Sequence, residues 1–451
     1  MPSSFHGLYS ASSALRVFQR QMDVVSHNLA NVGTAGYSRQ IGLAETTNPL
    51  MFFQGGQHSL GSGVGLASIT RIRDTLLEQT ARQTAAELGQ EQARLAGLQQ
   101  IEGIYGEPSD SGISASLGQF FDAWSGLGSN PSDSAYQLKV QAAGQTLTDK
   151  IRGAFEQLSR LEENQRAEAS AVFRQVNGLS EKIAELNGQI RSAAASGAVP
   201  NDLMDQRDVA LRDLSSLVKA EAFPQEDGTM LVYAAGGPLV SGDQAIGLDA
   251  SFDTSGTSPI DPSVLNKLGA GQLKGRLEAL SQTLNQKGQL NQLADSLRDE
   301  INALHSGGST GVDFFAPGST GAIDFNLSAA VKASPSNISS GTSASAGDGG
   351  LAHAIAQLRE SKLAGLGTKS FEGFFQDAIT GLGEQINSAK NGAESKLLLV
   401  QQIEEQVQSV SGVSMDEELT NMLQLQRAYQ AAAKTLQMID STTEQLLGLI
   451  R

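Results

Sequence analysis

Two pairs of carboxylates in this sequence have the residue types that acid–base chemistry uses. Asp205 and Asp208 form one pair, and the adjacent Glu417 and Glu418 form the other. A hydrolase needs two such groups, one as general acid and one as general base. Helix capping and solvated helix faces explain both pairs without catalysis. We therefore interpret these carboxylates as structural and expect no enzyme activity.

A glycine-rich segment and a histidine offer two further candidate sites. Gly61–Gly65 (GSGVG) has the composition of a phosphate-binding loop, but no strand clearly precedes it and no helix starts within it. We expect a flexible connector there. His305 and Asp313 flank another glycine-rich loop, yet two ligands make no closed metal site and the other histidines are scattered. The sequence predicts neither a metal nor another cofactor.

Composition narrows the class of protein. The 451 residues carry a formal charge of −16, which argues against nucleic acid or an anionic membrane surface as a partner. Cysteine is absent, and the 39% apolar and 5% aromatic content suits long helices better than a thick globular core. No run of eighteen apolar residues occurs, so we expect no membrane insertion. The first residues lack the features of a cleaved signal, which alone would indicate the cytoplasm.

The first helix is expected from Ser4 to about Asn31, with a turn at Gly33 to Arg39. Its apolar residues alternate in steps of three and four, the heptad pattern of a helix that lies along a partner helix. The flanking positions carry no paired charges, so an apolar stripe must select the partner. This N-terminal seam consists of Leu8, Ala11, Leu15, Phe18, Met22, Val25, Leu29 and Val32.

The last forty residues offer the partner helix. Ser414 has the form of an N-cap, with Glu417 three residues later reaching back as a capping box. An apolar stripe follows, interrupted at Gln426, Asp440 and Thr443. We expect the two ends to form one antiparallel helical pair. The predicted C-terminal stripe consists of Met415, Leu419, Met422, Tyr429, Ala433, Leu436, Leu447 and Ile450.

The residues between the two ends predict a mainly α, elongated, multi-domain chain. Long helices are expected over residues 74–105, 136–196, 264–304 and 371–408, the second with a sustained heptad pattern typical of coiled coils. After Pro200, Asn201 or Asp202 is expected to cap a further helix. Phe120, Phe121 and Trp124 are expected to anchor a helix–loop connection.

Strands are expected in a minority of segments. Residues 37–72 suggest extended structure with a hairpin, residues 218–251 a strand-and-turn segment, and residues 305–350 loops with strands at Ala322–Leu327 and near Val331. Three domains follow from this order. They are a terminal helical domain (1–40 with 411–451), a helical rod-like domain (41–217 with 264–304 and 351–410), and a small β-rich outer domain (218–263 with 305–350).

Four motifs carry a family resemblance. Ala30–Gln40 (ANVGTAGYSRQ) resembles the N-terminal signature of bacterial flagellar rod, hook and hook-associated proteins. Ser411–Glu418 (SGVSMDEE) and Gln426–Lys434 (QRAYQAAAK) resemble the C-terminus of the hook-associated members that join the hook to the filament. Asn201–Asp208 (NDLMDQRD) resembles a further hallmark of those members, with Met204 where leucine is usual.

The resemblance implies a structural subunit of the hook–filament junction. It implies a homo-oligomeric ring or helical layer, with the hook protein and a second junction protein or flagellin as neighbours. It further implies an export chaperone, an extracellular location in the flagellum, and export without a cleaved signal. For His305 and Asp313 it implies a structural turn. Alternatives are a hook, rod or filament subunit, or a cell-wall hydrolase.

The two terminal seams are the candidate functional site. They could be the core of a monomeric bundle, or they could drive assembly, which the resemblance favours. Tyr37 and Arg39 could be contact residues or only turn packing. We expect the termini to be poorly ordered in the free monomer and to become helical on assembly, because the pair alone leaves apolar surface exposed. The assembly seam comprises Leu8, Leu15, Phe18, Met22, Val25, Leu29, Leu419, Met422, Tyr429, Leu436, Leu447 and Ile450.

Overall fold

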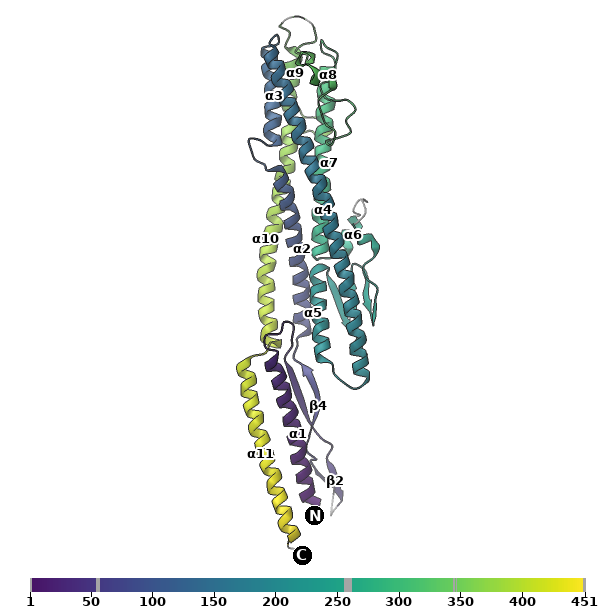
Figure 1. Ribbon diagram of the computed structural model, residues 1–451, viewed down its shortest axis with the longest axis vertical. Coiled ribbons are helices and arrows are strands. Elements are labelled where there is room, and N and C mark those ends of the chain that lie inside the picture. The colour runs from purple at the N-terminus through teal and green to yellow at the C-terminus, as the bar shows by residue number, and fades with distance from the viewer. Residues whose placement is uncertain (1, 54–56, 255–261, 344, 346, 449–451) are drawn as a thin grey trace. The chain divides into compact units, whose positions relative to one another are not determined.

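The computed structural model describes residues 2–53, 57–254, 262–343, 345 and 347–448 (Figure 1). The chain is mainly α, as predicted. It forms two compact units, each assembled from segments far apart in sequence. Unit 1 comprises Met1–Ala86, Gln175–Leu248 and Lys396–Arg451, and unit 2 comprises Glu87–Arg174 and Asp249–Ser395. This grouping separates residues 218–248 from residues 305–350, so the predicted three-domain division stays a prediction.

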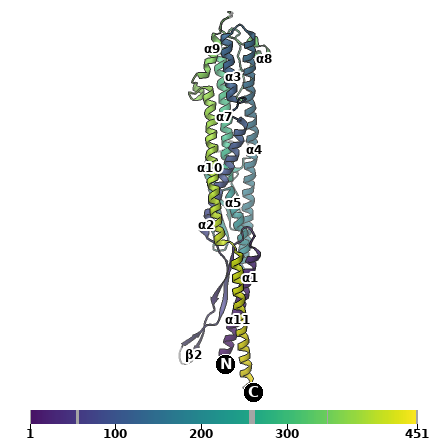
Figure 2. The same ribbon diagram turned by 90° about the vertical axis from the view of Figure 1, so that its left-hand side faces the viewer.

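Unit 1 contains the terminal helices. α1 (Pro2–Ala30) and α11 (Met415–Gly448) lie side by side and antiparallel, with their free ends together (Figures 1 and 2). A Cβ on Gly7 would lie 3.1 Å from Ile439 Cδ1, and at the other end of the pair Asn28 bonds to Glu418. The predicted pairing of the two chain ends is confirmed.

A long hairpin covers a second side of α1. β1 (Gln40–Thr46) pairs with β4 (Val64–Arg71), and β2 (Leu50–Phe53) pairs with β3 (Gln57–Leu60), both antiparallel. Both β1 and β4 contact α1. The turn into β4, predicted as a connector, is fixed to α1 because the Val64 amide donates to Ser13 Oγ at 3.4 Å. α1 therefore has two partners within its own chain, where the sequence predicted one.

The rest of unit 1 places a helix and a sheet beside this hairpin. The final part of α4 (Ser134–Ala195) leads to α5 (Asn201–Leu217). An antiparallel sheet follows in the order β5-β6-β7-β8, as expected for residues 218–251. Its strands are β5 (Ala220–Pro224), β6 (Met230–Ala234), β7 (Gly237–Ser241) and β8 (Gln244–Ala245).

Unit 2 is a helical bundle capped by loops and short helices. The first part of α4 and the greater parts of α2 (Thr75–Tyr105) and α10 (Phe371–Ser411) belong to it. The predicted aromatic anchor is confirmed, because Phe120, Phe121 and Trp124 are buried. The remaining helices are α3 (Ile113–Ser129), α6 (Pro262–Leu268), α7 (Gln272–His305), α8 (Ala329–Ala333) and α9 (Gly350–Gln357).

Two predictions in unit 2 are wrong. Ala322–Leu327 contributes only an isolated bridge between Leu327 and Phe315, and Val331 lies in α8 instead of a strand. Ser328 explains the second difference, since its side chain accepts a hydrogen bond from the Val331 amide and caps the helix. Such a short capped helix resembles a short apolar strand in sequence.

His305 is a buried part of the unit 2 core. Its Nδ1 contacts the Val312 carbonyl oxygen at 2.6 Å, and its Nε2 accepts from the Ser339 amide at 3.0 Å. Burial lowers the pKa of His305, so the ring is neutral near pH 7 with its proton on Nδ1. Among the described residues no group of three potential ligands is placed to hold a metal ion. No helix in the described ranges is long and apolar enough to cross a membrane.

Candidate functional site

The face of α11 that approaches α1 is built from small and medium side chains. Its partly buried positions recur in steps of three and four. Ala428 and Ala432 allow the two helices to approach closely, so the predicted bulky stripe supplies only part of this face. The partly buried positions are Asn421, Met422, Leu425, Ala428, Ala432, Ala433, Leu436, Ile439 and Thr443.

The remaining residues of the C-terminal stripe are of two kinds. Ala433 is partly buried, and Tyr429, which is 36% exposed, keeps heptad spacing from Met422 and Leu436, so both are compatible with the α1 contact. Leu419 is 45% exposed on another side of the helix, so its assignment to the α1 contact is wrong. Leu423 and Met438 are also exposed, at 55% and 69%. The side chain of Leu447, and Ile450 entirely, lie outside the described residues.

The predicted N-terminal seam is buried or partly buried along α1, and a second side of the helix is buried as well. Ala11 and Val25 are buried, and Val32 is 37% exposed beyond the end of the helix. Val17 and Val24 are buried as well, although the heptad pattern did not include them. They were missed because the pattern assumed a single partner. Leu8, Leu15, Phe18, Met22 and Leu29 are partly buried.

Asn28 ties the terminal helices to the loop between them. Its side chain is almost fully buried, and Nδ2 donates to Gln40 O at 2.9 Å and to Glu418 Oε2 at 3.0 Å. Its Oδ1 accepts from Tyr37 Oη at 2.8 Å and from the Gln40 amide at 3.0 Å. Every donor and acceptor of the amide group is therefore used, and one side chain joins α1, the loop, β1 and α11.

Arg39 forms ion pairs with the start of α11 next to Asn28. Arg39 Nε and Nη2 contact Glu418 Oε1 at 2.8 and 2.7 Å, and Nη1 contacts Glu417 Oε2 at 2.9 Å. The Arg39 amide also donates to the Ser411 carbonyl, at the end of α10. α11 begins at Met415 as predicted, but Glu417 is directed to Arg39 and not back to Ser414. The capping-box residues thus serve a long-range contact.

The Asn201–Asp208 motif forms a buried charge cluster and not a solvated helix face. Asp205 Oδ1 and Asp208 Oδ2 each lie 2.7 Å from Arg71 Nη1, and Arg73 also contacts Asp208. The Asp205 and Asp208 side chains are only 7% and 10% exposed. Ser38 joins the cluster, with its amide and hydroxyl both donating to Asp205. The carboxylates are neutralised in place, which leaves neither available as a general base.

The start of α5 also differs from the prediction. Pro200 occupies the N-cap position without a side-chain bond, so neither Asn201 nor Asp202 caps the helix. Asn201 Nδ2 instead donates to Gln40 Oε1 and to the Ile69 carbonyl. Asp202 Oδ1 accepts from Gln40 Nε2 at 3.1 Å. These side chains bind the hairpin to α5, a role that local sequence spacing does not reveal.

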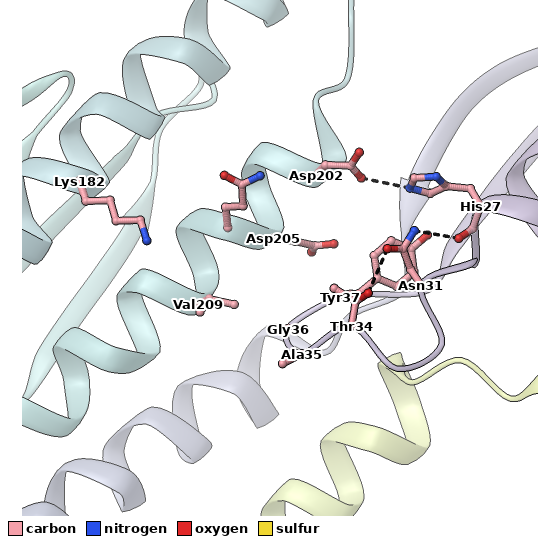
Figure 3. Close-up of a pocket in the computed structure, with 11 residues that line it drawn as sticks. His27, Asn31, Thr34, Ala35, Gly36, Tyr37, Lys182, Asp202, Asp205 and Val209 are labelled. Carbon is pink, nitrogen blue, oxygen red and sulfur yellow. Dashed lines mark hydrogen bonds and ion pairs between the residues drawn. The ribbon is translucent and has the colours of Figure 1, made fainter. Parts of the chain in front are cut away.

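The Gly36–Tyr37 turn is held against α5 (Figure 3). Gly36 has φ +80°, and a Cβ there would collide with Val209 Cγ2. A cavity of about 350 Å³ lies beside this turn, where His27 and Asp202 face each other. Burial raises the pKa of Tyr37, and Asp202, Asp205 and Glu418 raise it further. Within this chain the side chains of Tyr37 and Arg39 hold the turn in place through packing and hydrogen bonds.

Sequence reasoning missed Arg71 and Arg73 as partners of the motif. The two arginines stand two positions apart, but only Arg71 belongs to β4 and Arg73 follows in the segment before α2, so strand alternation does not predict the pair. Asp205 and Asp208 are three apart and share a helix face. Matching the two pairs requires knowing that β4 lies on α5, which neither segment encodes alone.

Comparison with known proteins places the chain in a family. Residues 98–315 match the profile of the flagellar hook-associated protein FlgK helical domain. Residues 404–449 match the flagellar basal body rod FlgEFG protein C-terminal profile, and residues 8–37 match the flagella basal body rod protein profile. The two rod-protein matches coincide with α11 and α1.

Whole-chain relatives and a solved structure agree with these profiles. Flagellar hook-associated protein 1 of Bacillus subtilis is 27% identical, with 99% of each chain covered. The Salmonella typhimurium protein of that name is 25% identical, covering 97% of this chain and 99% of its own. The flagellar hook junction protein FlgK from Burkholderia pseudomallei shares the fold at a TM-score of 0.64 and 17% identity, over 74% of this chain and all of its own. The predicted resemblance is confirmed, because the chain is similar over nearly its full length to flagellar hook-associated protein 1 of the bacterial flagellum.

Proposed function

We propose that this chain is a non-enzymatic structural subunit of the junction between flagellar hook and filament. Many copies would form a ring or short helical layer through a terminal domain made of residues 1–40 and 411–451. The observation that carries this proposal is the apolar face of α11 that α1 leaves uncovered. Leu419, Leu423 and Met438 are between 45% and 69% exposed on that face.

The exposed face supports assembly because Leu419 and Leu423, one helical turn apart, form an apolar patch without a partner in their own unit. Exposed apolar patches on a single soluble molecule mark sites of association. Leu419 and Leu423 lie on this side of α11, whereas Leu425 and Ile439 pack toward α1. Two different sides of one helix can therefore serve the subunit and the assembly. Unlike surfaces on each copy generate rings or helical layers.

The proposed neighbours in the flagellum are the hook protein on one side and a second junction protein or flagellin on the other. The profile matches at both termini support a shared mode of packing among axial proteins. We further propose export through the flagellar secretion system, with an export chaperone covering the exposed stripe of α11 beforehand. Export information is expected near the N-terminus, so removing residues 1–30 should leave the protein in the cytoplasm. Secretion of that truncated chain would contradict the placement.

Complementation of a deletion strain tests the junction role. The deletion strain should have hooks without stably attached filaments and should release flagellin to the medium, and the wild-type chain should restore filaments. Normal filaments on the deletion strain would contradict the proposal.

Substitutions on α11 test the exposed stripe. The double variant Leu419→Asp with Leu423→Asp should be secreted but fail to restore filaments. A matched control places aspartate at Thr435 and Thr442, two exposed polar positions on another side of the same helix, and should restore them. If the two variants behave alike, the exposed residues of α11 are not part of the interface.

A zymogram on purified cell wall tests the alternative enzyme class. Asp205, Asp208 and Glu418 are bonded to arginines, which favours the structural role. We expect no lysis band, and a clear band from the pure protein would favour a hydrolase.

A further inference from the structure

A groove lined by arginines lies in unit 1, apart from the α11 stripe. It has a volume of about 680 Å³ and is formed by the end of β4, the start of α2, α5, and the strands β5 and β6. Arg71, Arg73, Arg82 and Arg207 line it, together with only two carboxylates, Glu78 and Asp208. We call it the arginine groove.

Positive charge is in excess around the groove. Glu78 has three arginines near its Oε2, with Arg73 at 2.6 Å, Arg212 at 3.9 Å and Arg82 at 4.0 Å. Asp205 and Asp208 already form ion pairs with Arg71 and Arg73. Five arginines thus meet three carboxylates, in a chain whose formal charge is −16.

Arg82 is only weakly compensated by carboxylates. Its side chain is 15% exposed, and its nearest carboxylate oxygen is 4.0 Å away. Its Nε is buried and finds no acceptor among the described residues. Burial lowers the pKa of Arg82, and Arg73 and Arg212 lower it further while Glu78 opposes them. One more carboxylate would complete this site.

The rim of the groove is apolar, which favours a protein segment over a free ion. Leu76 is 72% exposed and Val199 is 53% exposed, and both line the opening. Large aliphatic side chains so exposed beside buried charges are typical of an interface whose partner is absent. The occupant should therefore present at least one carboxylate next to apolar side chains.

The start of α11 has this combination on its exposed side. Met415 is 51% exposed and Leu419 45%, and the Asp416 carboxylate between them makes no hydrogen bond or ion pair within the described ranges. We propose that the arginine groove binds the start of α11 from a second copy of this chain, with Asp416 reaching the arginines. Met415 and Leu419 would then cover the apolar rim. This inference rests on the self-assembly proposed above.

The positions of the two surfaces within unit 1 suit such a contact. Ser38 bonds to Asp205 beside the groove and the adjacent Arg39 bonds to Glu418 near the start of α11, so both surfaces lie at one level. Figure 1 shows α11 and β4 on opposite sides of α1. In copies related by rotation, the arginine groove of one copy could contact the start of α11 of the next copy. This is the heterologous geometry that closes rings.

Cysteine cross-linking tests the contact, because the chain has no cysteine of its own. The full-length variant Leu76→Cys with Leu419→Cys is expressed in the deletion strain, and isolated flagella are treated with a short bismaleimide. We expect a ladder of covalent oligomers on a denaturing gel. The matched control pairs Leu76→Cys with Met438→Cys, a more accessible site further along α11 (69% exposed against 45% for Leu419), and should give at least about tenfold less ladder.

Attached filaments without a ladder from the first pair, or equal ladders from both pairs, would overturn the groove contact and leave the junction proposal standing. Loss of the junction role itself is recognised separately, by normal filaments on the deletion strain.

A charge exchange provides a second test with the same cross-link. Asp416→Lys should lower the ladder yield about tenfold or more, and adding Arg82→Glu should restore it. If some variant fails to form flagella, the purified full-length protein at high concentration is cross-linked instead. An unchanged ladder with Asp416→Lys, or no recovery with Arg82→Glu, would contradict the assignment of Asp416 to the groove.

Discussion

Asn28→Asp is a nearly isosteric change that should separate the terminal helices in a pH-dependent way. The two bonds that Oδ1 accepts from Tyr37 and Gln40 can remain. The second oxygen, however, would replace a donor that now faces the Gln40 carbonyl and Glu418 Oε2 at 2.9 and 3.0 Å. Two donated bonds are lost, and a second carboxylate is placed against Glu418.

The expected cost follows from burial and distance. Two like charges about 4 Å apart at an effective dielectric near 20 repel by about 4 kcal/mol. Each lost bond adds about 1 kcal/mol. Burial and Glu418 raise the folded-state pKa of the new carboxyl, and 4 kcal/mol corresponds to about three pKa units. The sum is a loss of roughly 5–6 kcal/mol for the ionised form and about 1–2 kcal/mol for the protonated form.

The sign of the pH dependence is fixed by the raised pKa. Stability is retained below the unfolded pKa of about 4 and is lost as the pH rises through the folded pKa near 7. Between pH 5.5 and 7.5 the deficit relative to wild type should therefore grow by about 2 kcal/mol. Asn28→Ala loses all four bonds without adding a charge, so its deficit should not change over this interval.

Hydrogen exchange measured by mass spectrometry is the suitable assay, because it reports local opening. Peptides covering residues 20–40 and 411–425 should lose protection in the variant, after correction for intrinsic exchange rates at each pH. Trp124 is the only tryptophan and is buried in unit 2, so its fluorescence shows independently whether that unit is intact. A deficit that is equal at both pH values would refute the assignment of Asn28 Nδ2 as the donor to Glu418.

Three further predictions concern the turn, the charge cluster and the unit 2 core. Gly36→Ala should cost about 2–4 kcal/mol from its positive φ and the collision with Val209, and Val209→Ala in the same chain should recover all but about 1 kcal/mol, as read from protection of residues 31–40. Asp205→Asn should cost about 3 kcal/mol by leaving buried Arg71 undercompensated, whereas the exposed Asp202→Asn should cost under about 0.5 kcal/mol, both by the same measurement. Trp124→Phe should cost only about 1–2 kcal/mol in urea unfolding followed by circular dichroism, against about 3–5 kcal/mol for Phe120→Ala, because Trp124 Nε1 is buried without a partner among the described residues.

Helices with a sustained apolar period could be predicted from the sequence. The 62-residue α4 and the 29-residue α1 follow from heptad repeats, and a single segment holds all the information needed. The hairpin before Arg71 was also predicted from its glycines and short apolar runs. In these elements local pattern and tertiary structure agree.

The partner of each surface could not be predicted in the same way. Residues up to 390 positions apart meet at Asn28, so no window of sequence contains both sides of that contact. The same holds for Asp205 and Arg71, which lie 134 positions apart. On α11 the face toward α1 combines alanines with large residues such as Met422 and Leu436, whereas Leu419 lies on another side of the helix. The pattern of large apolar residues therefore predicted part of this face and missed Ala428 and Ala432.

The pairing of the first helix with the last also sets an order of events for folding. If the chain is exported N-terminus first, as the export proposed above would allow, α1 leaves the channel long before α11, and their contact cannot form until nearly the whole chain has been translocated. Asn28 and Glu418 are 390 positions apart, so this contact closes a loop almost as long as the protein and is strongly non-local. Unit 1 can be completed only when the final residues have emerged. The surface that would contact neighbouring subunits is then complete only after the whole chain has been exported. A partly translocated molecule would therefore be unable to assemble.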